Sequence, residues 1–196
     1  SEMCIRDRNN TGATAKKFIK PSYIVATLFT GSEQDDTPKG DSYILEDVVE
    51  DTTSISQDDN DVNDIECETS DSPILSIVKL GKYQFTAEVA DTQKDLLVAL
   101  MGFTAGTTVS TKYFAPAQYK KLYAKIDVVF EEGETMTAFV VPKVQLNSRL
   151  MLESLNSNIG RINLAGTAYD ANIADGAKTI RTPFYVDSAY TLPSAG

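Results

Sequence analysis

The chain has 196 residues, of which 42% are hydrophobic and 23% charged, and its formal net charge is -10. This length suits one domain with a sizeable core. The sequence has no histidine. This absence excludes Ser-His-Asp and Cys-His nucleophile pairs and every histidine-containing zinc site. We therefore expect a binding or structural protein without a cofactor, and not an enzyme.

Residues 1–8 resemble the conceptual translation of a sequencing-adapter fragment, and we set them aside as one would a tag. The other interpretation is a natural disordered N-terminus. If residues 1–8 are foreign, Cys67 is the only native cysteine and no intrachain disulfide can form. Residues 9–21 are predicted to be a flexible basic lead-in, 22–190 a single β domain, and 191–196 a C-terminal tail.

Alternating apolar residues and turn signals predict strands in the first half of the chain. The apolar stretch 23–29 follows three lysines, but it is short, begins after Pro21 and lacks a cleavage signal, so it indicates a strand and not a signal peptide. No stretch is long and apolar enough for a transmembrane helix. We predict strands at 22–30, 42–49, 52–57, 62–68, 74–80 and 82–90, a loop at 31–40 and a turn at 58–61.

One helix is predicted, with Asp91 or Thr92 as its N-cap and Gly102 as its C-terminal stop. Strands follow at 123–130 and 135–141 around a turn at 131–134, and Pro142 marks a strand edge or a bulge. Residues 143–152 are predicted to be extended, and residues 156–158 to form a turn. A strand containing Gly166 is predicted at 160–169, a loop at 170–182 and a short strand at 184–186. The predicted fold is mainly β, a two-sheet β-sandwich or barrel with one flanking α-helix.

The negative charge is concentrated in one segment. No Lys or Arg occurs between Lys39 and Lys79, whereas this interval holds twelve carboxylates. The rest of the chain has 16 acidic and 18 basic residues. Such a segment repels nucleic acid, copies of itself and anionic membranes. It is either a solvated disordered stretch or a surface that function keeps negative.

The acidic segment does not make a convincing metal site. Asp59, Asp61 and Asn63 have the spacing of the first calcium ligands of an EF-hand, but Asp64 stands where glycine is needed and Ser70 where the bidentate glutamate belongs. We therefore expect a solvated turn and no metal.

Other candidate chemistry is equally weak. The glutamates at 131, 132 and 134 indicate a hairpin tip more than the carboxylate pair of a glycoside hydrolase. Cys67 lies between two glutamates, which disfavour its thiolate. We expect no catalytic residue.

Bases and aromatics are interleaved between residues 112 and 125. This pattern permits nucleic-acid binding, a basic face that pairs with the acidic segment of a neighbouring copy, or ordinary surface lysines. The candidate residues of a basic inter-subunit face are Lys112, Lys120, Lys121 and Lys125.

Three stretches carry a resemblance to a known family. They are the acidic segment running into 70–74 (SDSPI), the strand-then-helix unit 80–91 (LGKYQFTAEVAD) into 96–103 (LLVALMGF), and 139–145 (FVVPKVQ) followed by 159–169 (IGRINLAGTAY). Their order resembles phage tail tube proteins, which are related to the tubes of contractile tails and to the type VI secretion tube subunit.

The resemblance implies that copies join into rings, commonly of six, by lateral strand pairing, and that rings stack into a tube. DNA would pass through this tube during ejection without specific binding, other tail proteins would be partners, and no membrane would be involved. The protein would be assembled in the bacterial host cytoplasm and reside in the virion tail. The acidic residues expected to face the lumen or the ring-to-ring contact are Glu50, Asp51, Asp58, Asp59, Asp61, Asp64, Glu66, Glu68 and Asp71.

Two other functions fit the same residues. One is a β-sandwich binding module for carbohydrate or surface attachment, which would use exposed aromatics on a sheet face and would not need to self-assemble. The other is a secretion-system tube subunit of the same fold.

Overall fold

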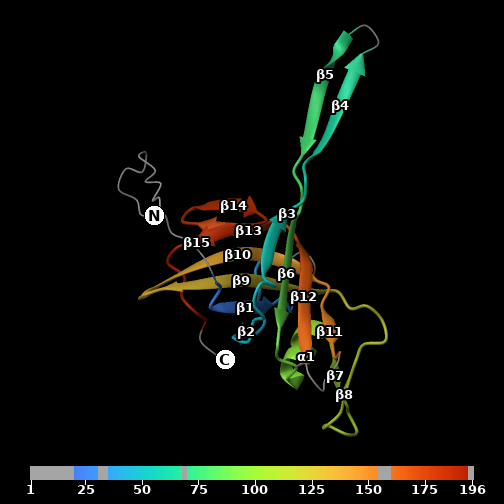
Figure 1. Cartoon of the computed structure of the whole chain (residues 1–196), viewed down its shortest axis with the longest axis vertical. Coiled ribbons are helices and arrows are strands. Elements are labelled where there is room, and N and C mark those ends of the chain that lie inside the picture. Colours follow the sequence, from blue (N-terminus) through green and yellow to red (C-terminus); the bar gives the residue numbers. More distant parts are fainter. Residues whose placement is uncertain (1–19, 31–34, 68–69, 154–159, 194–196) are drawn as a thin grey trace, which may run out of the picture.

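A computed structural model describes residues 20–30, 35–67, 70–153 and 160–193, with side chains described outside 66–75. The predictions for residues 1–8, for nearly all of 9–21, and for the turn at 156–158 lie outside this description. The described chain is mainly β, with one α-helix and antiparallel strand pairs, as predicted (Figure 1). No helix in the described chain has the length and apolarity to cross a membrane.

One large antiparallel sheet contains most of the strands. Its order is β2-β1-β9-β10-β12-β6-β3, with β11 added to β12 and β15 added to β10. These strands are β1 (Tyr23–Leu28), β2 (Ser42–Leu45), β3 (Ser54–Gln57), β6 (Tyr83–Val89), β9 (Leu122–Glu132), β10 (Thr135–Leu146), β11 (Arg149–Met151), β12 (Arg161–Ala168) and β15 (Tyr185–Asp187).

Three further strand pairs lie outside this sheet. They are β4 (Asp61–Cys67) with β5 (Ser70–Lys79), β7 (Thr104–Ala105) with β8 (Tyr113–Phe114), and β13 (Ala171–Asp175) with β14 (Lys178–Thr182). The loop predicted at 170–182 is therefore wrong. The chain reverses there through Gly176, whose φ is +60°, and the strand residues on both sides are mostly exposed, so the burial pattern of a strand is absent from the sequence.

A bulge in β10 directs the two halves of this strand to different neighbours. Its register with β9 shifts between Val141 and Val144, so two residues, Pro142 and Lys143, lie opposite Lys125. Residues 138–140 pair with β15, whereas 144–146 pair with β12. Proline cannot donate to the ladder and is suited to a bulge. Of the two alternatives predicted at Pro142, the bulge is confirmed and the strand edge is wrong, since β10 continues through this residue.

The bent sheet encloses the main core but does not close on itself. In Figure 1, β9 and β10 cross the molecule while β6 and β12 run nearly upright. Within the described residues, the end strands β2 and β3 each pair on one side only, so the barrel alternative is not realised. The largest fully buried side chains of this core are Ile24, Phe85, Val89, Leu100, Ile126, Val128, Val141, Ile162 and Leu164.

The helix α1 (Lys94–Met101) packs Leu96, Ala99 and Leu100 against this core. Its predicted C-terminal stop is confirmed, because Gly102 adopts the left-handed conformation with φ 74°. The predicted N-cap is wrong. Gln93 occupies that position without a side-chain cap, and Asp91 instead accepts the Gln93 backbone N–H at 2.9 Å, forming the turn that precedes the helix.

Gly166 allows β12 to approach β10 closely. A Cβ atom at this position would lie 2.4 Å from the Gln145 carbonyl oxygen and 2.4 Å from Val144 Cγ1. Both distances are far below van der Waals contact, and the first involves backbone that cannot rotate away. The strand contact next to the bulge therefore requires a residue without a side chain.

We predict that Gly166→Ala lowers the free energy of unfolding by about 1–3 kcal/mol, because the added methyl group overpacks the β10–β12 contact. Chemical denaturation monitored by circular dichroism measures this change. Gly133→Asn is the control, since nothing lies within 4 Å of a Cβ there and asparagine tolerates its φ of +66°. Unchanged stability of Gly166→Ala would contradict the close-approach argument.

Candidate self-association surface

The hairpin β4–β5 projects from the body of the molecule as an arm (Figure 1). Its strands pair antiparallel with Val62 opposite Val78 and Asn63 opposite Ile77. The chain enters the arm from β3 and leaves it toward β6, and these two strands are themselves paired. The arm is thus a continuation of one edge of the main sheet.

Backbone contacts hold the neck of the arm together. The Asp58 N–H donates to the Lys82 carbonyl at 2.9 Å, and the Gly81 N–H donates to Asn60 Oδ1 at 3.0 Å. A Cβ on Gly81 would lie 1.8 Å from the Asp58 carbonyl oxygen, so only glycine fits. The predicted turn at 58–61 is wrong, because residues 58–60 form one side of the neck without a turn and Asp61 already begins β4.

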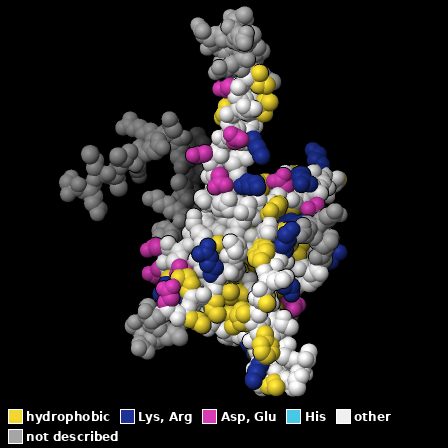
Figure 2. Space-filling model, turned by 90° about the vertical axis from the view of Figure 1, so that its right-hand side faces the viewer, with side chains coloured by type: hydrophobic (Ala, Val, Ile, Leu, Met, Phe, Trp, Pro, Cys, Tyr) yellow, Lys and Arg dark blue, Asp and Glu magenta, His cyan; other side chains and the backbone are white. Residues whose placement is uncertain are grey.

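The arm exposes apolar side chains on both faces. Since side chains alternate along a strand, Val62 and Val78 lie on one face and Ile65 and Ile77 on the other. These four side chains are 45–56% exposed. Figure 2 shows hydrophobic side chains along the arm below its tip. An isolated two-stranded hairpin is marginally stable in water, and exposed apolar clusters mark interaction surfaces. The arm therefore has the properties of a contact element for another molecule.

The predicted acidic residues are spread along the neck and arm instead of forming one cluster. Asp58 and Asp59 lie at the neck, whereas Asp61 and Asp64 lie on β4, and all four are exposed. Asp58 accepts a hydrogen bond from Gln84, and Asp64 accepts one from Ser76. Glu68 lies outside the described residues, as do the side chains of Glu66 and Asp71.

Glu50 and Asp51 lie apart from the arm, after β2. Glu50 forms a 2.6 Å ion pair with Lys20, whose hydrogen bond and charge hold the pKa of the exposed Glu50 carboxyl below its usual value. Asp51 adopts a φ of 60°, in the left-handed region that aspartate tolerates. Among the described residues, no group of three or more Asp, Glu, Cys or His is placed to hold a metal ion.

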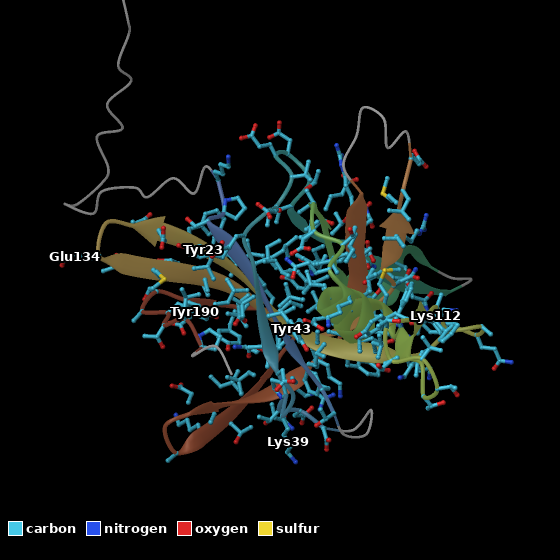
Figure 3. The ribbon with its side chains drawn as sticks, turned by 90° about the horizontal axis from the view of Figure 1, so that it is seen from below. Tyr23, Lys39, Tyr43, Lys112, Glu134 and Tyr190 are labelled. Atoms are coloured by element: carbon cyan, nitrogen blue, oxygen red, sulfur yellow. The ribbon has the colours of Figure 1, made fainter. Side chains whose placement is uncertain are left out.

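The predicted basic residues divide into two environments. Lys112, before β8, and Lys120 and Lys121, before β9, are exposed. Figure 3 shows Lys112 at the opposite end of the molecule from Glu134. Lys125 instead lies within the sheet, where its ammonium contacts Asp127 Oδ2 at 3.0 Å in the same chain. The structure therefore brings three of the four lysines to the surface.

Another lysine, Lys143, was not singled out from the sequence, and it is almost fully buried. Lys143, in the β10 bulge, donates to the Asp35 carbonyl at 2.7 Å. Its ammonium lies 5.5 Å from the Phe29 ring centroid and 5.4 Å from that of Tyr123. Cation–π attraction and this hydrogen bond compensate the lost hydration. No local sequence signal could have identified these partners.

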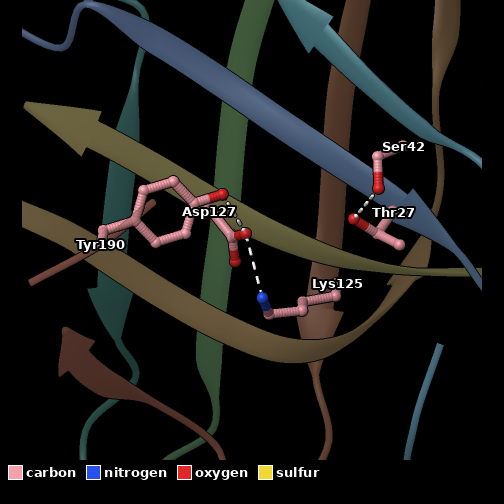
Figure 4. Close-up of polar contacts among 5 residues, drawn as sticks. All are labelled: Thr27, Ser42, Lys125, Asp127 and Tyr190. Atoms are coloured by element: carbon pink, nitrogen blue, oxygen red, sulfur yellow. Dashed lines mark hydrogen bonds and ion pairs between the residues drawn. The ribbon is translucent and has the colours of Figure 1, made fainter. Parts of the chain in front are cut away.

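The C-terminal segment covers the other face of the sheet, where a smaller core contains Val25, Val129, Ala138, Val140 and Tyr190. Asp127 lies in this layer and is 1% exposed. Its Oδ2 accepts the Tyr190 hydroxyl at 2.7 Å as well as Lys125 (Figure 4). Its Oδ1 has no partner within the described chain.

The buried environment of Asp127 disfavours ionisation of its carboxyl group. Burial raises the pKa of the Asp127 carboxyl, and the Asp187 carboxylate adds to this rise, whereas the charge of Lys125 and the hydrogen bonds from Tyr190 and Lys125 oppose it. Burial and the nearby Asp127 charge raise the pKa of the Tyr190 phenol, which therefore stays protonated as the donor. This contact fastens the C-terminal segment to β9.

We predict that Asp127→Asn changes how stability depends on pH. Because the pKa of Asp127 is higher in the folded state, its protonation favours folding; this contribution is present below about pH 4 and is lost as the pH rises through the raised value. The free energy of unfolding of the variant, relative to wild type, should therefore rise with pH across that window. Denaturant titrations at a series of pH values measure it.

The control is Glu134→Gln, which removes an exposed carboxyl at the β9–β10 turn. Its stability relative to wild type should vary little over the same range. A relative stability of Asp127→Asn that falls with pH would contradict the assigned direction.

No protein-family model matches this chain, and no curated protein sequence matches it either.

Proposed function

We propose that this chain is a structural subunit that assembles with copies of itself into stacked rings, forming the tail tube of a phage. The observation that carries the proposal is the projecting arm, whose apolar side chains are exposed on both faces. In a monomer, the apolar side chains of the arm stay in water and favour aggregation. A neighbouring subunit that packs against both faces removes this apolar surface from water.

The open ends of the main sheet support lateral assembly. Within the described residues, β2 pairs only with β1, and β3 pairs only with β6. Open strand edges are templates for pairing with another chain. If β2 of one copy meets β3 of the next, the contact joins two different surfaces and generates a ring when the rotation closes.

The distribution of charge supports a conduit for DNA. The neck and the lower arm carry Asp58, Asp59, Asp61 and Asp64, all exposed. Binding to DNA is driven by Lys and Arg contacts that release counterions from phosphates. Carboxylates along the path of the DNA make such contacts unfavourable, so the polymer slides without being held.

We predict that Ile77→Asp prevents stacking, because a carboxylate on the arm cannot be buried in a contact with the next copy without a large desolvation cost. Negative-stain microscopy of the purified protein should show rings or tubes for the wild type, and monomers or unstacked rings for the variant. Size-exclusion chromatography with light scattering gives the mass of each species.

Ile180→Asp is the matched control, because Ile180 is 49% exposed and Ile77 is 50% exposed, and both lie on two-stranded hairpins outside the main sheet. It should assemble like the wild type. A wild-type protein that stays a monomer of 21.4 kDa at high concentration would overturn the proposal. Equal assembly of the two variants would show that the arm is not the contact.

We further predict that replacing Asp59, Asp61 and Asp64 with asparagine makes the assembled protein retain DNA. The change removes three negative charges from the arm and neck, so retention should be strongest at low salt and weaken as salt rises. Co-sedimentation of assemblies with labelled double-stranded DNA measures it.

The charge-matched control replaces Glu134, Asp170 and Asp175 with their amides; these exposed carboxylates are not part of the arm or its neck. If both triple variants retain DNA equally, net charge and not the position of the acids governs the effect. If neither retains DNA, the acids of the arm do not face its path.

A further inference from the structure

A groove crosses the sheet formed by β10, β12 and β6, with a volume of about 660 Å³. It is lined by side-chain amides (Gln84, Gln145, Asn147), hydroxyls (Thr86, Thr167) and the ring of Tyr119. The remaining lining residues are small or apolar, and no lining residue is charged. Although 23% of the residues of the chain are charged, the groove combines polar and apolar surface without a charged lining residue.

Tyr119 forms a fixed aromatic wall of the groove. Its side chain is largely exposed, yet its hydroxyl donates to the Leu146 carbonyl at 3.2 Å and accepts from Gln145 Nε2 at 3.1 Å. These bonds join the ring to β10. An exposed ring held in one orientation loses little entropy when a ligand stacks on it.

The amides of the groove are also held in place. Gln145 Oε1 accepts the Tyr169 hydroxyl at 2.8 Å. Gln84 Oε1 accepts the Thr167 hydroxyl at 2.9 Å, and Gln84 Nε2 donates to Asp58 at 3.0 Å. Each glutamine thus keeps one amide hydrogen and one carbonyl lone pair for a ligand.

Two further polar groups of the groove are available for binding. Thr86 and Asn147 make no side-chain hydrogen bond to any described residue, and both line the groove. A hydroxyl and an amide can each donate and accept. The groove therefore presents several oriented donors and acceptors beside one aromatic face.

We propose that this groove binds a neutral saccharide, a function beyond the proposed self-assembly. Sugar hydroxyls pair with amides and hydroxyls that both donate and accept, and the C–H face of a pyranose ring packs on an aromatic side chain. A nucleic acid or another polyanion requires cations, which the lining lacks.

Isothermal titration of the full chain with cellohexaose, maltohexaose, chitohexaose and mannohexaose tests this proposal. At least one should bind, and Tyr119→Ala should weaken that binding roughly tenfold or more by removing the stacking surface. Thr86→Val, which removes one unpartnered hydroxyl without changing side-chain volume, should weaken it severalfold. Phe114→Ala is the control, because Phe114 is similarly exposed but lies on β8 outside the groove.

Several outcomes would overturn the assignment. Binding to none of the four hexasaccharides would do so, as would binding that neither Tyr119→Ala nor Thr86→Val weakens. Tighter binding of a dodecathymidine probe, lost in Tyr119→Ala, would make the groove a nucleic-acid site. Loss of assembly in Thr86→Val without added saccharide would make it a contact between copies. If Tyr119→Ala does not fold, Tyr119→Phe and Thr86→Val carry the test, and the binding measurements do not depend on whether tubes form.

Discussion

The fold depends on the place in β10 where Pro142 and Lys143 together oppose a single residue of β9. A bulge of this kind bends the strand and increases its twist. Because the register shifts, the first part of β10 pairs with the C-terminal strand β15 and the last part with β12. The sheet can therefore bend around the main core and also present its opposite face to a second, smaller core. Gly166 is part of the same arrangement, since it lets β12 reach β10 directly after the shift.

This arrangement places charged groups inside the protein, and each is compensated by polar or aromatic partners. Lys143 lies between two aromatic rings, and Asp127 is bound by Lys125 and Tyr190. A buried charge without such partners would destabilise the fold by several kcal/mol. The Asp127 contact has the further effect of fastening the C-terminal segment over the smaller core. A polar contact between Tyr190 and Asp127 thus holds the C-terminal segment against the otherwise apolar smaller core.

The arm contrasts with this well-packed body. Its neck is tightly fixed by Gly81 and by backbone hydrogen bonds, so the arm is held at its base, while its faces expose valine and isoleucine. Acidic residues lie along the same segment and oppose indiscriminate association through the apolar side chains. This combination favours a specific contact with a surface that supplies both apolar packing and suitable charge. The exposed lysines at 112, 120 and 121 are candidates for the charged part of that surface.

Local patterns were sufficient for the main features of the chain: its mainly β character, the single helix ending at Gly102, an irregularity at Pro142 and the acidic segment. These features depend on the period of side-chain burial and on backbone geometry, which neighbouring residues specify. The β13–β14 hairpin was missed because its strands are mostly exposed and lack that period. The absence of a turn at residues 58–60 was missed because Asp and Asn are common in turns, whereas here contacts with residues 81 and 82 hold the chain in the neck. The contact of Asp127 with Tyr190, the partners of Lys143, the two faces of the arm and the neutral groove were decided by tertiary structure alone. Each unites residues far apart in the chain, and packing of the bent sheet, not local sequence, determines which of them meet.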